Sequence, residues 1–290
     1  MKLPEKIDLH MHSTVSDGTD TPEEIIGRVR DAGISLFSVT DHDDVKTSRL
    51  IPPLLRAGDP AFVPGVEFSC RDEKGKYHVL GYGYDPGAAS ILQLVETGHA
   101  RRLKKVRARL ECLKNEFGFS FPDEELRGLM AMDNPGKPHI ARMMIRRGYA
   151  KSMDQAFRDY LNRLRLRSEY FRPEEAVRGI LAAGGIPVLA HPSYGDGDQL
   201  ILGEEMERRV RRLIGFGLQG LEAYYSGFTP RIRGELLALA ERYGLYVTAG
   251  SDYHGTNKLV VLGDTGLDRC EDGPEGLKRF LRALGKDREA

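Results

Sequence analysis

The chain has few cysteines and no long apolar run, and each absence excludes a class of protein. Its three cysteines, Cys70, Cys112 and Cys270, are scattered and form no CxxC pair. This spacing argues against a disulfide framework and against a thiolate zinc site. No apolar run reaches the length of about eighteen residues that a membrane-spanning helix needs. Met1 leads directly into a strand without a basic and apolar leader, so we expect a cytoplasmic protein.

The formal net charge of zero conceals an uneven distribution of charge along the 290 residues. Between His99 and Arg172 there are 18 Lys and Arg residues against 9 Asp and Glu residues, a net charge of +9, and the remainder carries −9. Charge runs often only solvate a helix face. The asymmetry therefore marks a distinct segment without identifying what that segment binds.

Short β-rich runs alternate with helical runs before and after this basic segment. Thr21, Pro22 and Glu24 have the spacing of a capped helix start. Strands are expected at residues 6–12, 36–43, 61–70, 77–84, 186–192, 218–225 and 245–255. Such alternation is typical of parallel strands joined by helices, and about seven such units favour a barrel over an open sheet.

Within the basic segment the β pattern gives way to helical periodicity. Leu103, Val106, Leu110 and Leu113 recur on one helical face. We therefore predict an α/β barrel formed by residues 1–97 and 173–290. An all-helical basic insertion, residues 98–172, is predicted to interrupt the barrel and to cap its active site.

Histidines and carboxylates gather in or beside the expected strands, where an unpaired charge would be costly to bury. The residues are His10, His12, Asp41, His42, Glu67, His78, His191, Asp252 and His254. The carboxyl ends of barrel strands face a common mouth, so residues far apart in sequence converge there. His10 and His12 lie on one face of their strand and can reach one ion, and Asp17 follows in a loop. Imidazole and carboxylate ligands without thiolates suit Zn, Mn or Fe.

Six motifs in this order resemble those of the polymerase and histidinol phosphatase (PHP) superfamily of metal-dependent phosphoesterases: DLHMHSTVSDG, VTDHD, PGVEFS, HVLGYG, LAHP and GSDYHG. The resemblance covers about residues 1 to 95 and 173 to 255. It implies a distorted seven-stranded barrel of the (β/α)7 type with a trinuclear metal centre at its mouth.

The resemblance also implies a ligand set for each metal. The first metal would be held by His10, His12, Glu67 and Asp252. Glu67 would bridge to a second metal that His78 and His191 complete, and the third would be held by Asp17, His42 and His254. A hydroxide shared by metals on Glu67, His10, His12 and His191 would attack phosphorus. Asp41 would orient an imidazole or serve the fold alone.

A stretch in the insertion, GKPHIARMMIRRG, resembles the RPHIAR stretch of a PHP subgroup that removes phosphate from nucleotides and trims short RNA from the 5′ end. Lys137 and His139 stand at a helix start with Arg142 one turn on, and together they favour an anion site. Lys137 stands where the subgroup often has an arginine. A lysine keeps the positive charge but cannot donate the two parallel hydrogen bonds of a guanidinium group. Phe228 stands near the place where relatives often carry a histidine, which puts a phosphate contact there in doubt.

These observations favour a cytoplasmic phosphoesterase with three divalent ions, Mn, Zn or Fe. Its expected substrate is a nucleotide or the end of a short RNA, and no stable protein partner is predicted. One alternative is a small-metabolite phosphatase of the histidinol phosphate type, which shares the metal site but does not need the basic insertion. Another is a non-catalytic nucleic-acid-binding or polymerase-accessory module, which predicts lost ligands.

Overall fold

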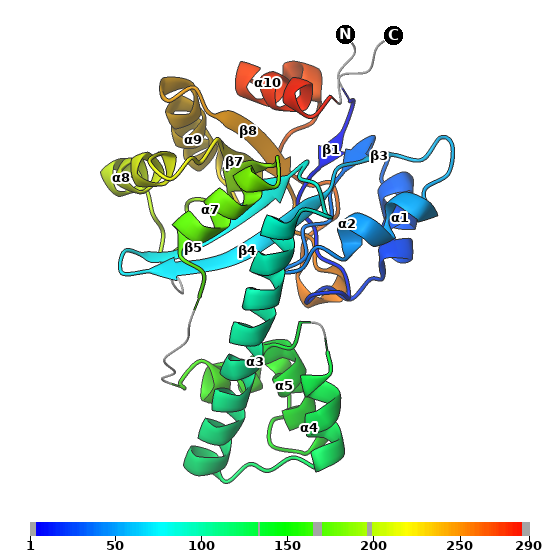
Figure 1. Ribbon diagram of the computed structural model, residues 1–290, viewed down its shortest axis with the longest axis vertical. Helices are drawn as coiled ribbons and strands as arrows, with labels where there is room; N and C mark the ends of the chain where they lie inside the picture. Colours follow the sequence, from blue (N-terminus) through cyan, green and yellow to red (C-terminus); the bar gives the residue numbers. More distant parts are fainter. Residues whose placement is uncertain (1–3, 133, 165–169, 196–198, 286–290) are drawn as a thin grey trace. The chain divides into compact units, whose positions relative to one another are not determined.

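The computed structural model describes residues 4–132, 134–164, 170–195 and 199–285 (Figure 1). The chain divides into two compact units, which are treated separately below. The first consists of Met1–Val95 and Phe171–Ala290, and the second of Glu96–Tyr170. Every strand of the described chain belongs to the first unit.

The strands of the first unit form two sheets. They are β1 (Ile7–Asp8), β2 (Leu36–Phe37), β3 (Ala61–Phe62), β4 (Gly65–Asp72), β5 (Gly75–Tyr82), β6 (Ile186–Leu189), β7 (Gly220–Tyr225) and β8 (Tyr246–Gly250). β1, β2 and β3 are parallel, as are β6, β7 and β8. β5 is antiparallel to both β4 and β6. The prediction of parallel strands throughout is therefore wrong at β5, because a tight turn joins β4 and β5 as a hairpin.

Isolated main-chain bridges link the edges of the two sheets. Met11, beyond β1, pairs with Tyr253, beyond β8, and His42, beyond β2, pairs with Glu67 of β4. These links extend the paths of β1 and β2 toward the larger sheet. The sheets nevertheless remain separate, and the predicted closed barrel is not confirmed. The broader prediction of a mixed α/β fold is confirmed.

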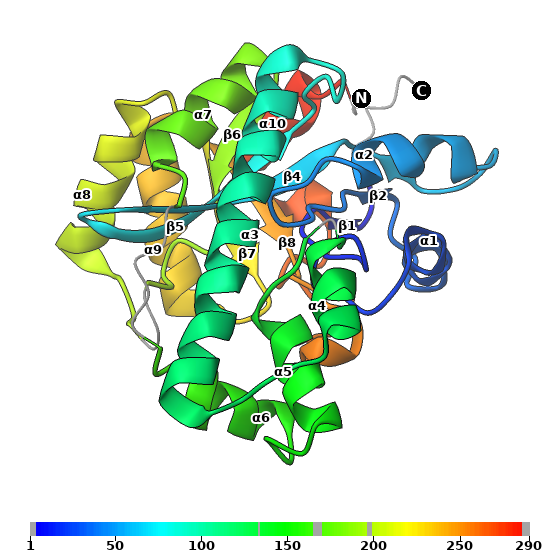
Figure 2. The same cartoon turned by 60° about the horizontal axis from the view of Figure 1, so that its bottom comes forward.

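Helices cover the strands of the first unit (Figure 2). They are α1 (Pro22–Asp31), α2 (Thr47–Leu50), α7 (Pro173–Ala182), α8 (Gly203–Ile214), α9 (Pro230–Arg242) and α10 (Glu275–Ala283). α7 packs on β4, β5 and β6, and α9 on β7 and β8. α1 begins at the predicted capping box, in which Thr21 and Glu24 each accept the other's backbone N–H. Short 3-10 turns lie at Pro52–Leu54, Gly255–Asn257 and Cys270–Asp272.

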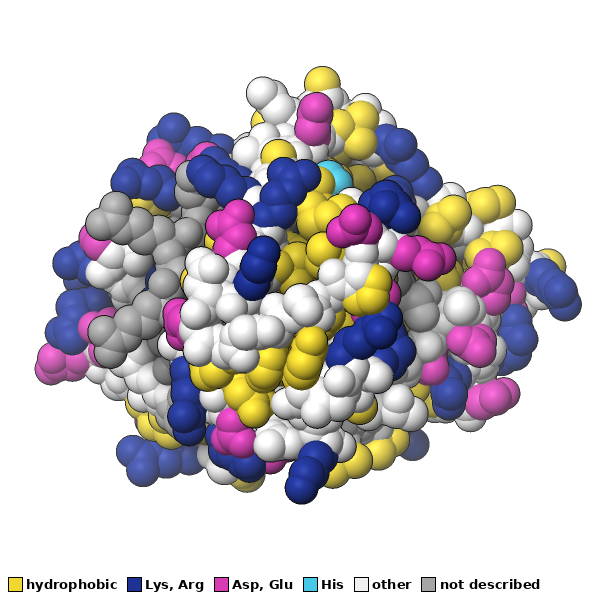
Figure 3. All heavy atoms as spheres, turned by 90° about the horizontal axis from the view of Figure 1, so that it is seen from below, with side chains coloured by type: hydrophobic (Ala, Val, Ile, Leu, Met, Phe, Trp, Pro, Cys, Tyr) yellow, Lys and Arg dark blue, Asp and Glu magenta, His cyan; other side chains and the backbone are white. Residues whose placement is uncertain are grey.

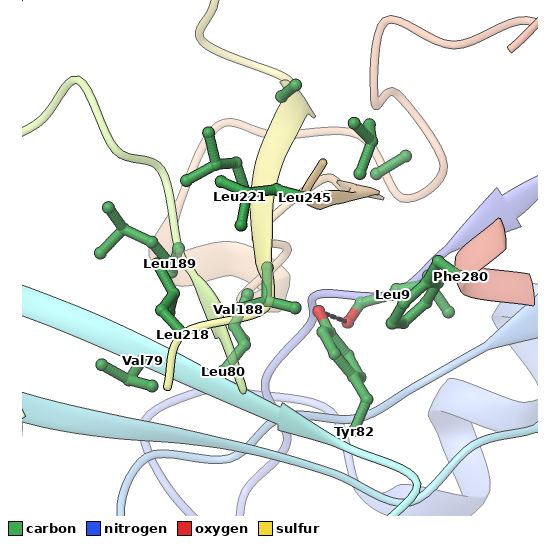
Figure 4. Packing of buried hydrophobic residues seen from close by; sticks show 14 of the residues in the cluster. Leu9, Val79, Leu80, Tyr82, Val188, Leu189, Leu218, Leu221, Leu245 and Phe280 are labelled. Carbon is green, nitrogen blue, oxygen red and sulfur yellow. Dashed lines mark hydrogen bonds between the residues drawn. The ribbon is translucent and has the colours of Figure 1, made fainter. Parts of the chain in front are cut away.

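A buried tyrosine ties three elements of this core together. The Tyr82 hydroxyl of β5 donates to the Leu9 carbonyl oxygen at 2.9 Å, as Figure 4 shows. The Tyr82 ring meets the ring of Phe280 on α10 edge to face, with centroids 5.5 Å apart. Because the hydroxyl has a partner, the whole ring can be buried without an unsatisfied polar group. The main chain that leads to His10 is thereby anchored to the core.

The described part of the second unit is helical. α3 (Ala89–Phe117) begins in the first unit and continues into the second, followed by α4 (Asp123–Met130), α5 (Lys137–Arg146), α6 (Met153–Gln155) and a π-helical segment, Ala156–Leu161. Val106 and Leu113 of α3 are buried in one cluster with Ile140 and Met144 of α5. These two α3 residues lie on the face that the periodicity predicts.

Charged side chains of both signs occupy the surface. On the face drawn in Figure 3, Lys and Arg side chains alternate with Asp, Glu and hydrophobic side chains. Among the described residues, no helix combines the length and apolar character that crossing a membrane requires.

Candidate metal centre

All nine predicted ligand residues lie in the first unit, and their donor atoms fall into four groups with mutual distances within 4.8 Å. The groups are His12, Asp17, His42 and His254; His10, His12 and Glu67; His10, His191 and Asp252; and His42, Glu67 and His78. The convergence that the sequence predicts therefore exists. Since four of the nine residues each belong to two groups, the assignment of every residue to one ion stays a prediction. These four are His10, His12, His42 and Glu67.

The first and last strands place three of these residues by direct main-chain pairing. The Asp252 N–H donates to the His10 carbonyl oxygen at 2.7 Å, and the His12 N–H donates to the Tyr253 carbonyl oxygen at 2.8 Å. The approach requires glycine at Gly250, where a Cβ would collide with His10. Residues separated by most of the chain thus form one wall of the site.

The Glu67 carboxylate, 1% exposed, lies among five imidazoles. Its Oε1 is 2.8 Å from His78 Nδ1 and 3.0 Å from His191 Nε2. Its Oε2 is 3.1 Å from His42 Nδ1, 3.3 Å from His12 Nε2 and 3.4 Å from His10 Nε2. No other carboxylate among the described residues reaches so many histidines. Glu67 is the centre of the arrangement.

Several donor atoms of this cluster suit a cation better than a hydrogen bond. His10 Nε2, His12 Nε2 and Glu67 Oε2 are buried and have no hydrogen-bond partner. Their nitrogen to oxygen separations of 3.3 and 3.4 Å match those of two ligands bound about 2.0–2.2 Å from one first-row metal ion, which are about 3.0–3.4 Å apart. Orphaned buried polar atoms are rare in folded proteins. The residues present therefore fit bound divalent metal.

Burial and mutual charge shift the pKa values of the cluster strongly. Burial lowers the pKa of His42 to about 3 and that of His78 to about 4, so both rings are neutral at pH 7. Burial also lowers the pKa of His12, but Asp252 and Glu67 outweigh it and raise the value to about 9. Burial raises the pKa of Glu67, yet its interactions with the surrounding histidines, His78, His42 and His10, outweigh burial and hold that pKa well below its usual range. The carboxylate is therefore ionised.

The backbone is strained at the cluster. Among the described residues, the non-glycine residues with positive φ are Asp43 at 54°, His191 at 27° and Asp252 at 60°. Two are predicted ligands and the third follows His42. Left-handed backbone costs of order 1–3 kcal/mol for a non-glycine residue and is retained mainly at functional sites. At His191 and Asp252 the strained backbone carries side chains that lie in the cluster.

Known proteins are similar to this chain over nearly its whole length. A model of the PHP domain family matches residues 8–288. The 3′,5′-nucleoside bisphosphate phosphatase of Chromobacterium violaceum is 31% identical over 288 residues, with 96% of each chain covered. The chain belongs to the PHP domain family. The sequence resemblance is thereby confirmed.

Other relatives of this PHP domain are also named as phosphoesterases. The phosphoribosyl 1,2-cyclic phosphate 1,2-diphosphodiesterase of Eggerthella lenta is 30% identical over 262 residues, 86% of this chain and 94% of the relative. The 5′-3′ exoribonuclease Rnm of Escherichia coli is 29% identical over 269 residues, 88% of this chain and 87% of the relative. A solved candidate metal-dependent phosphoesterase from Bifidobacterium adolescentis superposes with a TM-score of 0.81 at 26% identity, over 97% of this chain and 98% of that one. The predicted class, a metal-dependent phosphoric ester hydrolase, is confirmed.

Asp41 of this PHP domain supports a loop rather than an imidazole. Its Oδ1 accepts the Ser13 N–H at 2.8 Å, its Oδ2 accepts the Ser13 hydroxyl at 2.7 Å, and Ser16 Oγ also donates to it. Ser16 Oγ lies 3.4 Å from His12 Nδ1, so any influence on that ring passes through the serine. Asp41 holds the loop that carries Asp17.

Glu222 on β7 orients a histidine, and sequence reasoning missed it. Its Oε1 lies 2.9 Å from His10 Nδ1, and its Oε2 accepts the His191 N–H at 2.7 Å. A proton held on Nδ1 leaves the orphaned Nε2 of His10 as the lone-pair donor for a cation. The available signal was an acidic residue in the apolar strand GLEAYY, which needs a buried partner.

The Asp252 carboxylate faces histidines with one oxygen and contacts a tyrosine and a lysine with the other. Its Oδ1 lies 3.3 Å from His12 Nε2 and 3.5 Å from His10 Nε2. Its Oδ2 accepts the Tyr225 hydroxyl at 2.8 Å and contacts Lys258 Nζ. Tyr225 is therefore part of the site rather than only a core aromatic. Phe228 packs on the Tyr225 ring with centroids 5.0 Å apart, in a buried position.

Asp8, at the end of β1, is a further buried carboxylate that holds main chain. Its Oδ1 accepts the Ser251 N–H at 2.9 Å, and its Oδ2 accepts the Ser251 hydroxyl at 2.6 Å and the Gly263 N–H at 2.8 Å. Burial raises the pKa of Asp8 although these hydrogen bonds act in the opposite direction. The residue before Asp252 is thereby fixed to the first strand.

The three predicted substrate-binding residues lie on α5 of the second unit. Lys137 Nζ donates to Asn162 Oδ1 at 2.7 Å. His139 Nδ1 accepts the Gly136 N–H at 3.1 Å, so the ring caps the helix. Arg142 is exposed one turn further on. Their predicted place over the metal cluster stays a prediction.

Replacing Glu222 by Gln is expected to weaken cation binding by about 10–100-fold, the usual effect of losing a carboxylate that orients a ligand histidine. The amide can still accept the His191 N–H but no longer compensates a proton on His10 Nδ1. Cation affinity is measured by titration of metal-free protein. Glu241→Gln, at an exposed position of α9, is the matched control; equal affinities in the two variants would contradict the assignment.

Cation binding should release protons near neutral pH. In the metal-free protein the pKa of His12 is about 9, so below pH 9 a cation must displace a proton from this ring. Apparent cation affinity should therefore rise as pH increases from 6 to 8. Calorimetry in buffers of different ionisation enthalpy measures the protons that cation binding releases. A binding enthalpy that is the same in every buffer would contradict the competition between proton and cation at His12.

Proposed function

We propose that the chain is a cation-dependent phosphoesterase that hydrolyses phosphate monoesters of nucleotides or trims short RNA from the 5′ end. One observation carries the proposal: Glu67 gathers five imidazoles beside Asp252, in a chain that matches a nucleoside bisphosphate phosphatase over 96% of its length. The Escherichia coli relative named as a 5′-3′ exoribonuclease supports the RNA activity.

The nine residues of the four donor groups would hold three divalent ions, with Mn, Zn and Fe the best suited to imidazole and carboxylate donors. When bound, such ions lower the pKa of water for attack on phosphorus and offset the charge of the phosphate oxygens. No serine or cysteine nucleophile is needed for this class of reaction.

Side chains of this chain prepare the site for that chemistry. Glu222 keeps the His10 Nδ1 proton in place, so that Nε2 faces the cluster. Tyr225 and Lys258 hold Asp252 Oδ2, which keeps Oδ1 toward His10 and His12. His42 and His78 are neutral at pH 7 and can bind a cation without first losing a proton. Binding therefore costs little rearrangement of these rings.

The helical segment is proposed to bind the substrate. In this arrangement residues 1–97 and 173–290 form a distorted barrel with the metal centre at its mouth, and residues 98–172 cap it. Lys137, His139 and Arg142 would contact substrate phosphate. Because His139 Nδ1 accepts a hydrogen bond, the neutral ring carries its proton on Nε2 and can donate there to a phosphate oxygen.

A phosphodiesterase activity on small cyclic phosphates is a second candidate. It is favoured by the 30% identity to the Eggerthella lenta enzyme named for that reaction. The same donor groups serve either reaction, so substrate preference decides between them. A non-catalytic role has less support, because all nine predicted ligand residues lie together.

Hydrolysis should require added Mn or Zn and should favour nucleotides over histidinol phosphate. His10→Ala and Asp252→Ala should each lower kcat/KM by more than about 100-fold, which exceeds the effect of losing a residue that only orients a ligand. Phosphate release is measured with AMP, a 3′,5′-bisphosphate, a 5′-phosphorylated dinucleotide, a cyclic phosphate and histidinol phosphate. His99→Ala, a histidine outside the donor groups, is the control. Turnover that persists without metal would exclude the mechanism.

The role of α5 in substrate binding can be tested with variants that leave the start of the helix capped. His139→Gln keeps a side chain able to cap Gly136, as glutamine does at this helix position, but removes the imidazole. We expect His139→Gln and Arg142→Ala to raise KM for nucleotides about 10-fold with little change in kcat. Arg146→Ala, one turn further along α5, is the control. A KM unchanged in both variants would remove α5 from the substrate site.

A further inference from the structure

A pocket of about 200 Å³ opens at the metal centre, entirely within the first unit. Its walls include His42, Glu67, His78, His191, Asp252 and His254, together with two lysines, Lys76 and Lys258. Pockets for drug-sized ligands are larger, roughly 300–1,000 Å³. The space therefore suits the phosphorylated end of a substrate better than a whole nucleotide.

Lys76 faces this pocket without a counter-ion among the residues that the structure describes. It lies on β5 two residues before His78, so both side chains point to the same side of the strand. No hydrogen bond or ion pair joins its ammonium group to a described residue. Its ammonium group is therefore available to a ligand in the pocket.

The strand pairing fixes the face of the hairpin on which Lys76 lies. Lys76 lies directly opposite Arg71 in the β4–β5 hairpin, on the face that also carries Glu67 and His78. The hairpin therefore directs the Lys76 side chain to the face that borders the pocket.

Lys258 brings another ammonium group to the same pocket, from the segment after β8. Its side chain is 40% exposed, and Nζ contacts Asp252 Oδ2, the oxygen turned away from His10 and His12. An ammonium group has three N–H donors, so this contact leaves others for a ligand. The lysine therefore lies on the outer side of the predicted ligand shell.

We propose that Lys76 and Lys258 form a lysine subsite that binds a second phosphate group of the substrate, beside the one that is hydrolysed. The inference rests on the proposed phosphoesterase function and narrows its substrate class to molecules with two nearby phosphates. Spacing favours a second group over the reacting one, because side chains two residues apart on a strand are about 7 Å apart. A nucleoside bisphosphate and a 5′-phosphorylated oligonucleotide share this chemistry.

The decisive variant is Lys76→Met, which removes the charge and contacts no predicted ligand. Steady-state KM and kcat are measured in the metal-loaded enzyme for AMP, adenosine 3′,5′-bisphosphate and a 5′-phosphorylated dinucleotide. We expect KM for one or both two-phosphate substrates to rise about 10-fold with kcat within twofold, and KM for AMP to change less than twofold. A charge-assisted hydrogen bond has about this effect on binding. The substrate that responds shows whether the second phosphate lies on the same nucleotide or along the chain.

Two controls accompany this variant. Lys76→Arg keeps the charge and should retain the wild-type KM values. Lys74→Met makes the same change in the exposed turn of the hairpin and should have no effect on KM. The thermal midpoint of Lys76→Met should stay close to that of the wild type, because the Lys76 ammonium group makes no hydrogen bond or ion pair with a described residue. A lowered midpoint together with unchanged KM values would indicate a structural role and overturn the proposal.

Failure of the subsite and failure of the proposed function give different results. An equal rise of KM for AMP and for both two-phosphate substrates would place Lys76 on the reacting phosphate and overturn the subsite. No change for any substrate would overturn it as well. If wild-type enzyme with metal hydrolysed none of the three substrates, the proposed function itself would be wrong, and the subsite would fall with it.

Discussion

The arrangement depends on a single buried carboxylate, that of Glu67, held among five imidazole rings. A carboxylate with 1% exposure is stable only if positive charge or hydrogen-bond donors surround it. In the absence of cations, protonated histidines supply that charge, and their own burial opposes it. Cations can replace these protons, so metal binding and stability of the cluster are coupled.

Other buried carboxylates hold the main chain around this centre instead of facing it. Asp8 binds the segment before Asp252, Asp41 binds the loop that carries Asp17, and Glu222 joins β7 to His10 and to the backbone of His191. Each accepts hydrogen bonds from groups that regular strand pairing leaves without partners. The strands β1 and β2 can therefore be only two residues long and still deliver ligands at defined positions.

Local patterns in the sequence predicted local features well. The capping box at Thr21 and Glu24 and the α3 face containing Val106 and Leu113 follow from spacing alone. The ligand residues were found because histidines at strand ends matched ordered motifs. The antiparallel direction of β5 was missed, although the six residues between the two expected strands, 71–76, are too few for the crossover that parallel strands need. Lys258 was missed because its meaning depends on contact with Asp252 rather than on neighbours in sequence.

The pairing between the beginning and the end of the chain has a consequence for biosynthesis. His10 and His12 rely on hydrogen bonds with Asp252 and Tyr253, which leave the ribosome more than two hundred residues later. Domains emerge from their N-terminal side during synthesis, so the first strand must wait for the last before its histidines are fixed. The cluster can form only after the residues up to His254 have been translated, and metal capture therefore follows the synthesis of that segment.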